Sequence, residues 1–319
     1  MKVVIPGGSG QVGAILRRAL SAAGHEVVVL SRSPGRDDVA WDGQTLGPWT
    51  RELEGAGAVI NLAGRSVNCR YNPENRRAIM ESRVASTAVV GQAIAACVDP
   101  PPVWLQASTA TIYSHRYDAA NDEEHGILGG GEAGVPDTWR FSIDVARAWE
   151  EALAAAVTPR TRKVAMRSAM VMSPDPGGVF DVLLGLVRRG LGGKAADGRQ
   201  YVSWVHHEDF ARAVCWLIEH DALTGAVNVA APGPLPNAQF MGALREAWGA
   251  RFGLPATRLM LEAGAVLLRT ETELVLKSRR VIPTRLVEAG FQFRFPAWPP
   301  AARDLCAEWR ARHSVTTAG

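Results

Sequence analysis

The chain has 319 residues, of which 47% are hydrophobic and 21% are charged. This balance excludes a disordered, fibrous or low-complexity protein, and the length suits one large α/β unit or a core domain with a smaller one. The 35 Lys and Arg residues against 32 Asp and Glu residues leave a net charge of only +3, and they are scattered. We therefore expect no nucleic-acid partner, while small anionic ligands remain open.

The longest apolar runs, such as Glu26–Leu30 and Ala265–Leu268, are far shorter than the roughly 18 to 20 residues that a membrane span needs. No secretion signal is visible, so we expect a cytoplasmic protein without a membrane partner. The four cysteines are widely separated and form no CxxC pair: Cys69, Cys97, Cys215 and Cys306. They are typical of small buried side chains in a reducing compartment, and we predict neither a disulfide framework nor a metal site.

The N-terminal segment reads as a strand, a helix and a second strand. Lys2–Pro6 is rich in β-branched residues, Gln11–Ala23 carries apolar residues at helical spacing, and Glu26–Leu30 is a short buried run. A glycine-rich turn separates the first strand from the helix, and Gly24 ends the helix. The pattern predicts a βαβ unit within about thirty residues.

The alternation continues toward the middle of the chain. We predict strands at Ala58–Leu62, Val103–Ser108 and Lys163–Met172, and helices at Asn75–Cys97 and Thr138–Ala156. Strands that alternate with helices form a parallel sheet with helices on both faces. The fold class is therefore α/β, a Rossmann-type doubly wound parallel sheet, with the ligand expected at the carboxyl ends of the strands.

Beyond Met172 short segments are interrupted by Pro and Gly, which indicates a smaller C-terminal substrate domain interleaved with the last core elements. Helices are expected at Asp209–Glu219 and Asn237–Trp248, and again after Pro296. We assign residues 1–168 plus about 202–230 to the Rossmann domain that binds the ligand. Residues of about 169–201 and 231–313 form the substrate-side domain, and 314–319 a disordered tail.

The first turn carries the GxxGxxG motif of Gly7, Gly10 and Gly13. Glycines let the backbone turn tightly and approach a pyrophosphate, and the helix N-terminus then offers it unpaired N–H groups. Because the motif follows a strand and opens a helix, it predicts a dinucleotide site. The residues of this turn assigned to the cofactor are Gly7, Ser9, Gly10, Gln11, Val12 and Gly13.

The end of the second strand indicates which dinucleotide is bound. Sites selective for NAD usually place a carboxylate there to bind the ribose 2′-hydroxyl, whereas this chain has Ser31, Arg32 and Ser33. Arg32, helped by Ser33 and Arg36, would bind a 2′-phosphate through charge-assisted hydrogen bonds. We therefore predict NADP(H) as the cofactor, the alternative for Arg32 being a solvated loop residue.

These features resemble the extended short-chain dehydrogenase/reductases, and more closely their atypical epimerase-like branch, often labelled nucleoside-diphosphate-sugar epimerase or cell-division-inhibitor-like protein. The resemblance runs nearly end to end, and its last three segments are not shared by ordinary dehydrogenases of this fold. The matching segments are GGSGQVG, NLAG at Asn61–Gly64, RRAIMESRVAST at Arg76–Thr87, STATIY at Ser108–Tyr113, AWEEA at Ala148–Ala152, GRQYVSWVHHED at Gly198–Asp209, NVAAPGPLPNAQF at Asn228–Phe240 and SRRVIPTRLVEAGFQF at Ser278–Phe293.

The resemblance implies a path for the cofactor between its adenosine and its nicotinamide. The turn after the fourth strand would line that path with Asn61, Leu62, Ala63 and Gly64. It also implies that Ser108 and Thr109 lie near the nicotinamide, where related enzymes place a Ser or Thr that binds the substrate oxygen. Without the family, the same turn reads equally well as an ordinary strand end.

The Tyr and Lys pair that active members of this superfamily use is missing. In the motif YxxxK a nearby ammonium and the cofactor lower the Tyr pKa from about 10 so that it can transfer a proton. No tyrosine of this chain has a lysine four residues further on. In the corresponding helix, Ser142 and Ala146 occupy the two positions.

Three residues are therefore candidates for catalysis: Thr109, Tyr113 and His206, whose imidazole titrates near neutrality. On a strand, His206 and His207 would face opposite sides, which argues against a metal pair. His206 would alternatively be a hydrogen-bonded residue at a helix start. Arg167 would either bind an anionic group of the cofactor or form a salt bridge in the core.

Two functions from different classes follow. The first is an NADP(H)-dependent oxidoreductase or epimerase that acts on a small polar substrate between the two domains. The second is a non-catalytic protein that binds NADP(H) and senses its redox state, which the missing dyad supports. The partner is a small molecule in the first case, and a homodimer is open in both.

Overall fold

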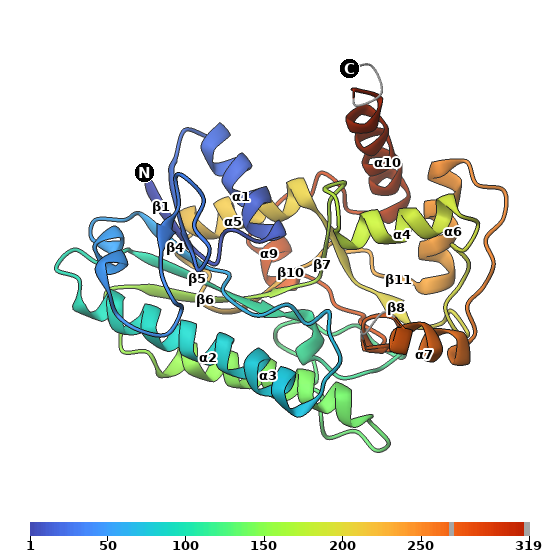
Figure 1. Cartoon of the computed structure of the whole chain (residues 1–319), viewed down its shortest axis with the longest axis horizontal. Helices are drawn as coiled ribbons and strands as arrows, with labels where there is room; N and C mark the ends of the chain where they lie inside the picture. Colours follow the sequence, from blue (N-terminus) through green and yellow to red (C-terminus); the bar gives the residue numbers. More distant parts are fainter. Residues whose placement is uncertain (268–270, 316–319) are drawn as a thin grey trace.

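The computed structural model describes residues 1–267 and 271–315, and its central feature is a seven-stranded parallel sheet (Figure 1). The strand order is β10-β6-β5-β4-β1-β2-β3. The strands are β1 (Lys2–Pro6), β2 (Glu26–Ser31), β3 (Val39–Ala40), β4 (Ala58–Asn61), β5 (Val103–Thr109), β6 (Arg162–Ser168) and β10 (Gly225–Val229). Sheet and helices together form the predicted doubly wound α/β fold, and a smaller C-terminal region completes it.

Helices cover both faces of the sheet. One face carries α1 (Gln11–Ala22) and α5 (His207–Glu219), and the other carries α2 (Pro73–Ala96) and α3 (Asp137–Ala155), as Figure 1 shows. Because side chains of a strand alternate, Val3 and Ile5 pack toward α1 and α5, whereas Val4 packs toward α2. The sheet therefore lies between two apolar layers. Because its strands are parallel, their carboxyl ends lie at one edge of the sheet.

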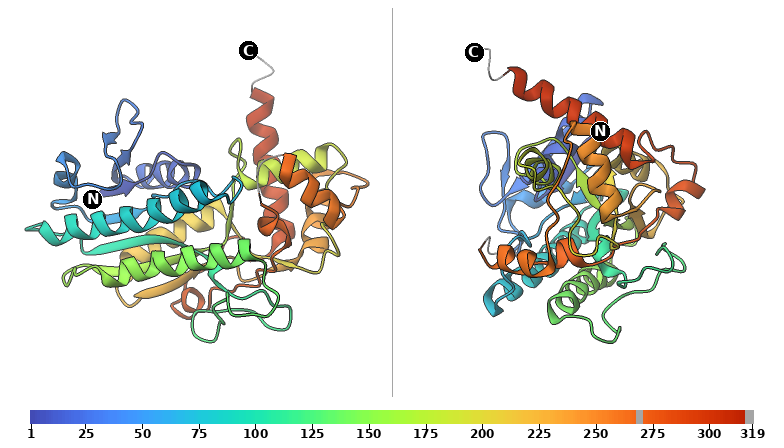
Figure 2. Two further views of the ribbon diagram at one scale, coloured as in Figure 1. Left: turned by 60° about the horizontal axis from the view of Figure 1, so that its bottom comes forward. Right: turned by 90° about the vertical axis from the view of Figure 1, so that its right-hand side faces the viewer.

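The C-terminal region has its own apolar core. It contains Phe180, Trp204, Phe240 and Trp298, all nearly inaccessible to solvent. Its strands are β7 (Met170–Met172), β8 (Tyr201–Val202), β9 (Trp204–His206) and β11 (Leu235–Pro236), and its helices are α4 (Val179–Arg188), α6 (Asn237–Trp248), α7 (Arg258–Leu267), α8 (Glu273–Leu276), α9 (Thr284–Glu288) and α10 (Trp298–Val315). The C-terminal end of α10 stands clear of the body in both views of Figure 2. No helix among the described residues is both long enough and apolar enough to cross a membrane.

The predicted strand Lys163–Met172 is wrong in one respect. The chain leaves the sheet after Ser168, and Met170–Met172 pairs instead with β9 as the separate strand β7. Ala169 lies between them and donates its N–H to the carbonyl of Val229. This break carries the chain from the sheet into the C-terminal region.

The other predicted elements agree within a few residues, and Asn237–Trp248 agrees at both ends. Ser314 and Val315 belong to α10, so the predicted tail begins too early, and 316–319 lie outside the described residues. The domain boundaries stay a prediction. The four cysteines are free thiols, with Cys97 and Cys306 buried and the other two half-buried.

Candidate functional site

The three glycines of the first turn have different roles. Gly7 has a φ of +75°, and a Cβ there would lie 2.6 Å from the Cα of Ala63, so the turn packs directly on the loop after β4. A Cβ on Gly13 would lie 2.2 Å from the carbonyl oxygen of Gly8. At Gly10 the nearest atom is 3.9 Å away. Gly7 and Gly13 are therefore required by the packing of the protein itself, whereas Gly10 borders open space.

The N-terminus of α1 fits a pyrophosphate. Its N-cap Gly10 provides no side-chain hydrogen bond, and its first turn contains no acidic residue. Backbone N–H groups there lack intrahelical partners and attract an anion. Ser9 is exposed, and Gln11 and Val12 are half-buried. Gln11 also reaches the loop after β7, where its Nε2 donates to the carbonyl of Asp175 at 3.5 Å.

The end of β2 presents one exposed cation. Ser31 is buried, and its Oγ donates to Ser9 Oγ at 3.1 Å and accepts from the Ser33 N–H at 3.2 Å. Arg32 is exposed and makes no hydrogen bond or ion pair with any described residue. The two serines therefore tie β2 to the glycine turn and leave the Arg32 guanidinium available for a ligand.

A buried side chain holds the turn after β4 in shape. Asn61 is fully buried, donates from Nδ2 to Gln106 Oε1 at 3.0 Å, and accepts the Ala63 N–H at 3.1 Å. Its side chain thus shapes the turn and does not face a ligand. Leu62 is half-buried and Gly64 is exposed, and a Cβ on Gly64 would lie 3.2 Å from Cζ of Arg83.

A buried network fixes several residues that the sequence assigned to the site. Arg167 donates from Nε and Nη2 to both carboxylate oxygens of Glu150, at 2.9 and 2.8 Å, and from Nη1 to the Tyr113 hydroxyl at 2.9 Å. Ser108 Oγ also donates to Glu150, at 2.6 Å, and the Tyr113 hydroxyl donates to Asn228 at 2.9 Å. The network links α3 to strands β5, β6 and β10.

This network corrects two predictions. Arg167 is the core salt bridge, because Glu150 and Tyr113 occupy its Nε, Nη1 and Nη2 atoms. Tyr113 is only 2% exposed, and burial raises the pKa of its hydroxyl, so it is not positioned to exchange a proton with a substrate. Ser108 donates to Glu150, and its place near the nicotinamide stays a prediction. Of the pair at the end of β5, Thr109 lines a cavity between the sheet and the C-terminal region.

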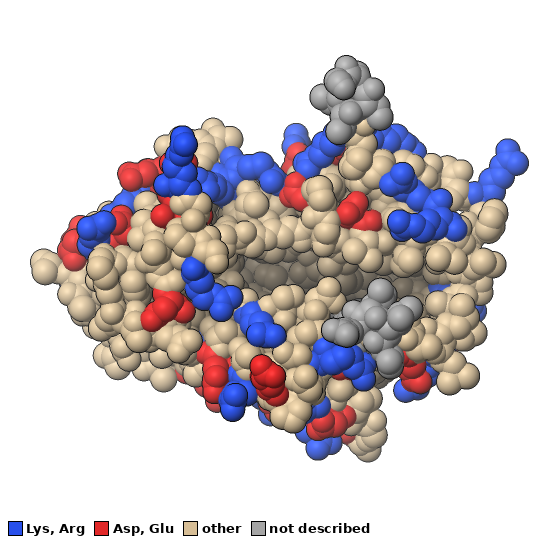
Figure 3. Space-filling view, in the orientation of Figure 1, with Lys and Arg blue, Asp and Glu red and all other residues tan. Residues whose placement is uncertain are grey.

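That cavity has a volume of about 150 Å³ and contains Thr109. Thr109 Oγ1 accepts the Thr111 N–H at 3.1 Å, which leaves its hydroxyl hydrogen available to a ligand. The cavity is lined by Val67, Tyr71, Ile79, Arg83, Thr109, Thr111, Phe141, Ser142, Val145, Trp149, Glu273 and Arg279. The face of the molecule in Figure 3 is hollowed between the sheet and the C-terminal region.

Ser142 lies where the helix register predicts the missing tyrosine. It lines the cavity together with Thr109, and its Oγ donates to Glu273 Oε2 at 2.5 Å. Ala146, at the position of the missing lysine, is fully buried against Ile112 and Tyr113. The helix α3 therefore offers a hydroxyl but no phenol and no amine to this cavity.

Five polar residues of the cavity were missed by the sequence analysis: Tyr71, Arg83, Thr111, Glu273 and Arg279. They come from the loop after β4, from α2, from the turn after β5 and from the segment around α8. No fixed spacing along the chain connects them. The available signal was that Arg83, Thr111 and Arg279 lie inside segments that match the family, whereas Tyr71 and Glu273 lie outside them.

His206 does not belong to this cavity. It is fully buried at the junction of β9 and α5, its Nδ1 accepts the Glu208 N–H at 3.2 Å, and its ring stacks on Phe295 at 4.0 Å. Burial, aided by the charge of His207, lowers the pKa of His206 to about 3. The prediction that His206 donates a proton near neutral pH is therefore wrong, and its alternative role as a helix cap is correct.

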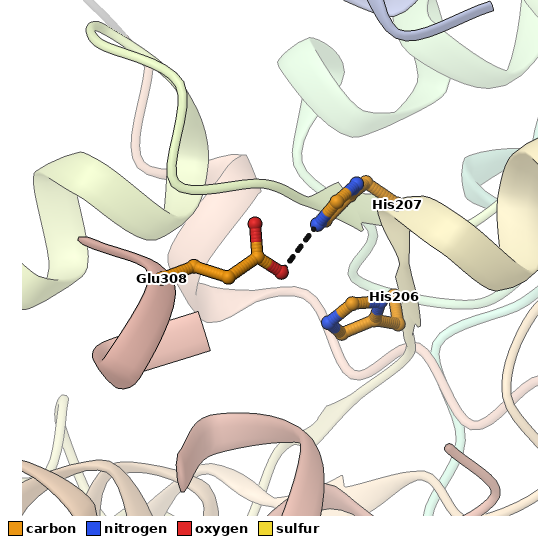
Figure 4. A group of neighbouring side chains, drawn as sticks. All are labelled: His206, His207 and Glu308. Atoms are coloured by element: carbon orange, nitrogen blue, oxygen red, sulfur yellow. Dashed lines mark hydrogen bonds and ion pairs between the residues drawn. The ribbon is translucent and has the colours of Figure 1, made fainter. Parts of the chain in front are cut away.

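His206 and His207 lie side by side, contrary to the expectation of opposite faces (Figure 4). Residue 207 already belongs to α5, so strand alternation does not apply. The two rings stack at 4.5 Å, His207 Nε2 lies 3.0 Å from Glu308 Oε1, and His206 Nε2 lies 3.3 Å from Asp304 Oδ2 without hydrogen-bond geometry. The ligand atoms of His206, His207 and Glu308 lie within 4.8 Å of one another, a spacing that could hold a metal ion.

The tautomer of His206 argues against that metal. A backbone N–H can only donate, so Nδ1 must be unprotonated to accept it, and Nε2 of the neutral ring then carries the proton. A protonated Nε2 offers no lone pair to a cation. The cluster is better described as a buried neutral imidazole beside the carboxylates of α10.

The comparisons with known proteins agree with this geometry. The model described as "NAD dependent epimerase/dehydratase family" matches residues 3–230, and one described as "Domain of unknown function (DUF1731)" matches residues 256–305. Epimerase family protein SDR39U1 of Bos taurus is 31% identical over 313 residues, which cover 96% of this chain and 100% of that protein.

Solved structures extend the likeness. Human epimerase family protein SDR39U1 (isoform 2), crystallised with NADPH, superposes with a TM-score of 0.84 at 29% identity, covering 96% of this chain and 99% of that one. A nucleoside-diphosphate sugar epimerase from Corynebacterium glutamicum gives a TM-score of 0.75 at 27% identity, covering 99% of this chain and 61% of that one. The resemblance drawn from the sequence is confirmed, and this chain belongs to the NAD-dependent epimerase/dehydratase family.

Proposed function

We propose that this chain is an NADP(H)-dependent oxidoreductase that acts on a small polar carbonyl or hydroxyl compound. The observation that carries the proposal is the cavity at the carboxyl end of β5, where hydroxyls of Thr109, Ser142 and Tyr71 surround one space. Hydroxyls around a small cavity suit a substrate oxygen that gains or loses a proton while its carbon exchanges a hydride.

The size of the cavity favours a small substrate. Its volume is about 150 Å³. Pockets for drug-sized ligands occupy roughly 300 to 1,000 Å³. A compound of a few carbon atoms therefore fits better than a nucleotide sugar, which supports simple carbonyl reduction over epimerisation of a large substrate.

The cofactor site supports NADP(H). The glycine turn and the α1 N-terminus accommodate a pyrophosphate, and the hydride would come from the nicotinamide of this cofactor. The exposed Arg32 supplies a cation at the end of β2. That end of the strand carries no carboxylate, which would prefer a free 2′-hydroxyl. The related human protein crystallised with NADPH, which is consistent with the same choice here.

Titration calorimetry with NADPH and NADH tests the cofactor choice. We expect NADPH to bind about tenfold or more tightly, because pairing of Arg32 with the 2′-phosphate contributes about 1.5 to 3 kcal/mol. Arg32→Ala should remove the preference and leave NADH affinity unchanged. Arg51→Ala, at an arginine on the exposed surface, is the matched control. Equal affinities for the two cofactors in the wild type would contradict the assignment.

A non-catalytic NADP(H) sensor is the second candidate, and the missing Tyr and Lys pair is the observation that favours it. The two functions differ in turnover. NADPH oxidation would be followed in the presence of small dialdehydes and quinones. Stoichiometric binding of NADPH without oxidation by any of these compounds would favour the sensor.

A further inference from the structure

Tyr71 is held rigidly at the wall of the cavity. It lies in the loop between β4 and α2, is 8% exposed, and packs edge-to-face on Phe141 with ring centroids 5.1 Å apart. Its N–H donates to Glu271 Oε1 at 2.8 Å, and its carbonyl accepts from Arg76 Nε at 2.9 Å. Ring and backbone are thus both fixed, which a proton donor requires.

The Tyr71 hydroxyl reaches the place where α3 lacks a phenol. It lies close enough to the side chain of Ser142 for that hydroxyl to lower the Tyr71 pKa, and Ser142 in turn donates to Glu273. Glu273 is 1% exposed, and burial raises the pKa of its carboxyl, against the effect of Arg279. A phenol from another segment therefore occupies the surroundings of Ser142, inside the same cavity as Thr109.

Arg83 is the cation beside this phenol. It comes from α2, lines the cavity, and donates from Nη1 to the carbonyls of Ile79 and Arg65 at 3.0 and 3.1 Å. Its guanidinium lies over the Trp149 ring and against Gly64 of the expected cofactor turn. Among the described residues, no carboxylate lies within ion-pair distance of Arg83. A half-buried cation without an acidic partner favours an anion in its neighbourhood.

We infer that Tyr71 is the catalytic residue that donates the proton to the substrate oxygen, and that Arg83 stabilises its phenolate in place of the missing lysine. This inference rests on the proposed function. In carbonyl reduction, a hydride with two electrons passes from NADPH to the carbonyl carbon. The O–H bond of Tyr71 breaks, and that proton forms the O–H bond of the alcohol. Oxidised cofactor and the phenolate remain, and the phenolate regains a proton from the solvent.

The charged groups around Tyr71 set the pH dependence. Burial raises its pKa, the Ser142 hydroxyl lowers it, and Glu273, Cys69 and Glu271 raise it further. The protonated phenol is the donor, so reduction proceeds below its pKa and is lost as the pH rises through that pKa. Burial lowers the pKa of Arg83 to about 10, so this cation is present at neutral pH. We expect no break in the rate between about pH 6 and 8.

The first experiment compares Tyr71→Phe with the wild type in NADPH-dependent reduction of methylglyoxal, a small dicarbonyl. The variant keeps the ring on Phe141 and should lose kcat by about 10²-fold or more, with KM and NADPH affinity within twofold. Tyr117→Phe, at a tyrosine that is 40% exposed outside the cavity, is the matched control. Turnover by Tyr71→Phe at the wild-type rate would overturn the inference and leave the proposed function standing.

The second experiment does not depend on turnover. The chain has four tyrosines, so the difference in tyrosinate absorbance between wild type and Tyr71→Phe isolates the ionisation of Tyr71. Arg83→Gln should move that ionisation up by about one pH unit, and Arg83→Lys should restore it. If Arg83→Gln leaves the ionisation of Tyr71 unchanged, the pairing of Arg83 with Tyr71 is overturned. A wild type that binds NADPH but reduces no carbonyl would instead overturn the proposed function, and with it the donor role of Tyr71.

Discussion

Gly10 is the residue at which cofactor binding can be separated from folding. A Cβ there meets no atom closer than 3.9 Å, whereas a Cβ on Gly13 would lie 2.2 Å from a backbone oxygen. We predict that Gly10→Val abolishes NADPH binding, since the branched side chain fills the space of the pyrophosphate, while the circular dichroism spectrum stays native. Gly13→Val should instead destabilise the fold itself. Calorimetry together with thermal unfolding of both variants measures the two effects.

Normal NADPH affinity in Gly10→Val would mean that the glycine turn is purely structural. Unfolding of Gly10→Val to the same extent as Gly13→Val would show that the open space beside Gly10 is needed by the protein rather than by a ligand. Either result would displace the cofactor from the N-terminus of α1, and Arg32 would lose its proposed partner.

Site residues that are contiguous in sequence could be predicted, and those that converge from distant segments could not. Gly7, Gly10 and Arg32 follow strands directly, so the direction of a parallel sheet places them at its ligand edge. Tyr71 is followed four positions on by Asn75 rather than by a lysine, so the YxxxK pattern does not single it out. Arg167 had two open interpretations, and only the position of Glu150 on the neighbouring helix decides between them.

At the scale of elements, regular periodicity gave accurate boundaries and short segments did not. The amphipathic patterns of α1 and α6 extend over three turns and define their ends. The strands β7, β8, β9 and β11 have two or three residues each, which is too short for any periodicity to be recognised. The turn of the chain at Ala169 depends on pairing of Met170 with Trp204, which lies 34 residues further on.

The junction of β9, α5 and α10 makes stability depend on acid. His206 caps α5 through a neutral ring, and burial lowers its pKa to about 3 from 6.5. Below about pH 6.5 the unfolded chain binds a proton there and the folded chain does not. Stability should therefore be complete above pH 6.5 and fall by up to about 1.4 kcal/mol per pH unit as the pH drops toward 3.

His206→Asn tests this dependence, because the amide oxygen can still cap α5 while the titrating ring is removed. Urea unfolding at pH 7.5 and 5.5 should show a loss of about 1 kcal/mol or more in the wild type that is absent from His206→Asn. His125→Asn, at a 78% exposed histidine, should behave as the wild type. An equal acid-induced loss in His206→Asn would show that other groups cause it.

At the scale of the whole molecule, Asp175 connects the two ends of the chain to the loop after β7. Its carboxylate accepts from Arg18 of α1 at 2.6 Å, from Ser173 at 2.7 Å and from Arg312 of α10. Burial opposes its ionisation, yet these three hydrogen bonds lower its pKa to about 2. A single partly buried carboxylate thus fixes the last helix of the C-terminal region to the first helix of the sheet.

Asp175→Asn should lower the free energy of unfolding by about 2 kcal/mol at pH 7, because the shift from the pKa of 3.8 corresponds to that much stabilisation of the ionised form. The difference from the wild type is complete above about pH 4 and disappears as the pH falls toward 2. Amide hydrogen exchange in α10 should also be faster in the variant than in the wild type, because the Arg312 contact is lost. Exchange in β1 and β4 should stay unchanged, because the sheet core is untouched. Asp118→Asn, whose carboxylate is 73% exposed beside Arg116, is the control and should change neither quantity. An Asp175→Asn variant as stable as the wild type, with unchanged exchange in α10, would mean that apolar packing around Trp298 alone holds the C-terminal region to the sheet.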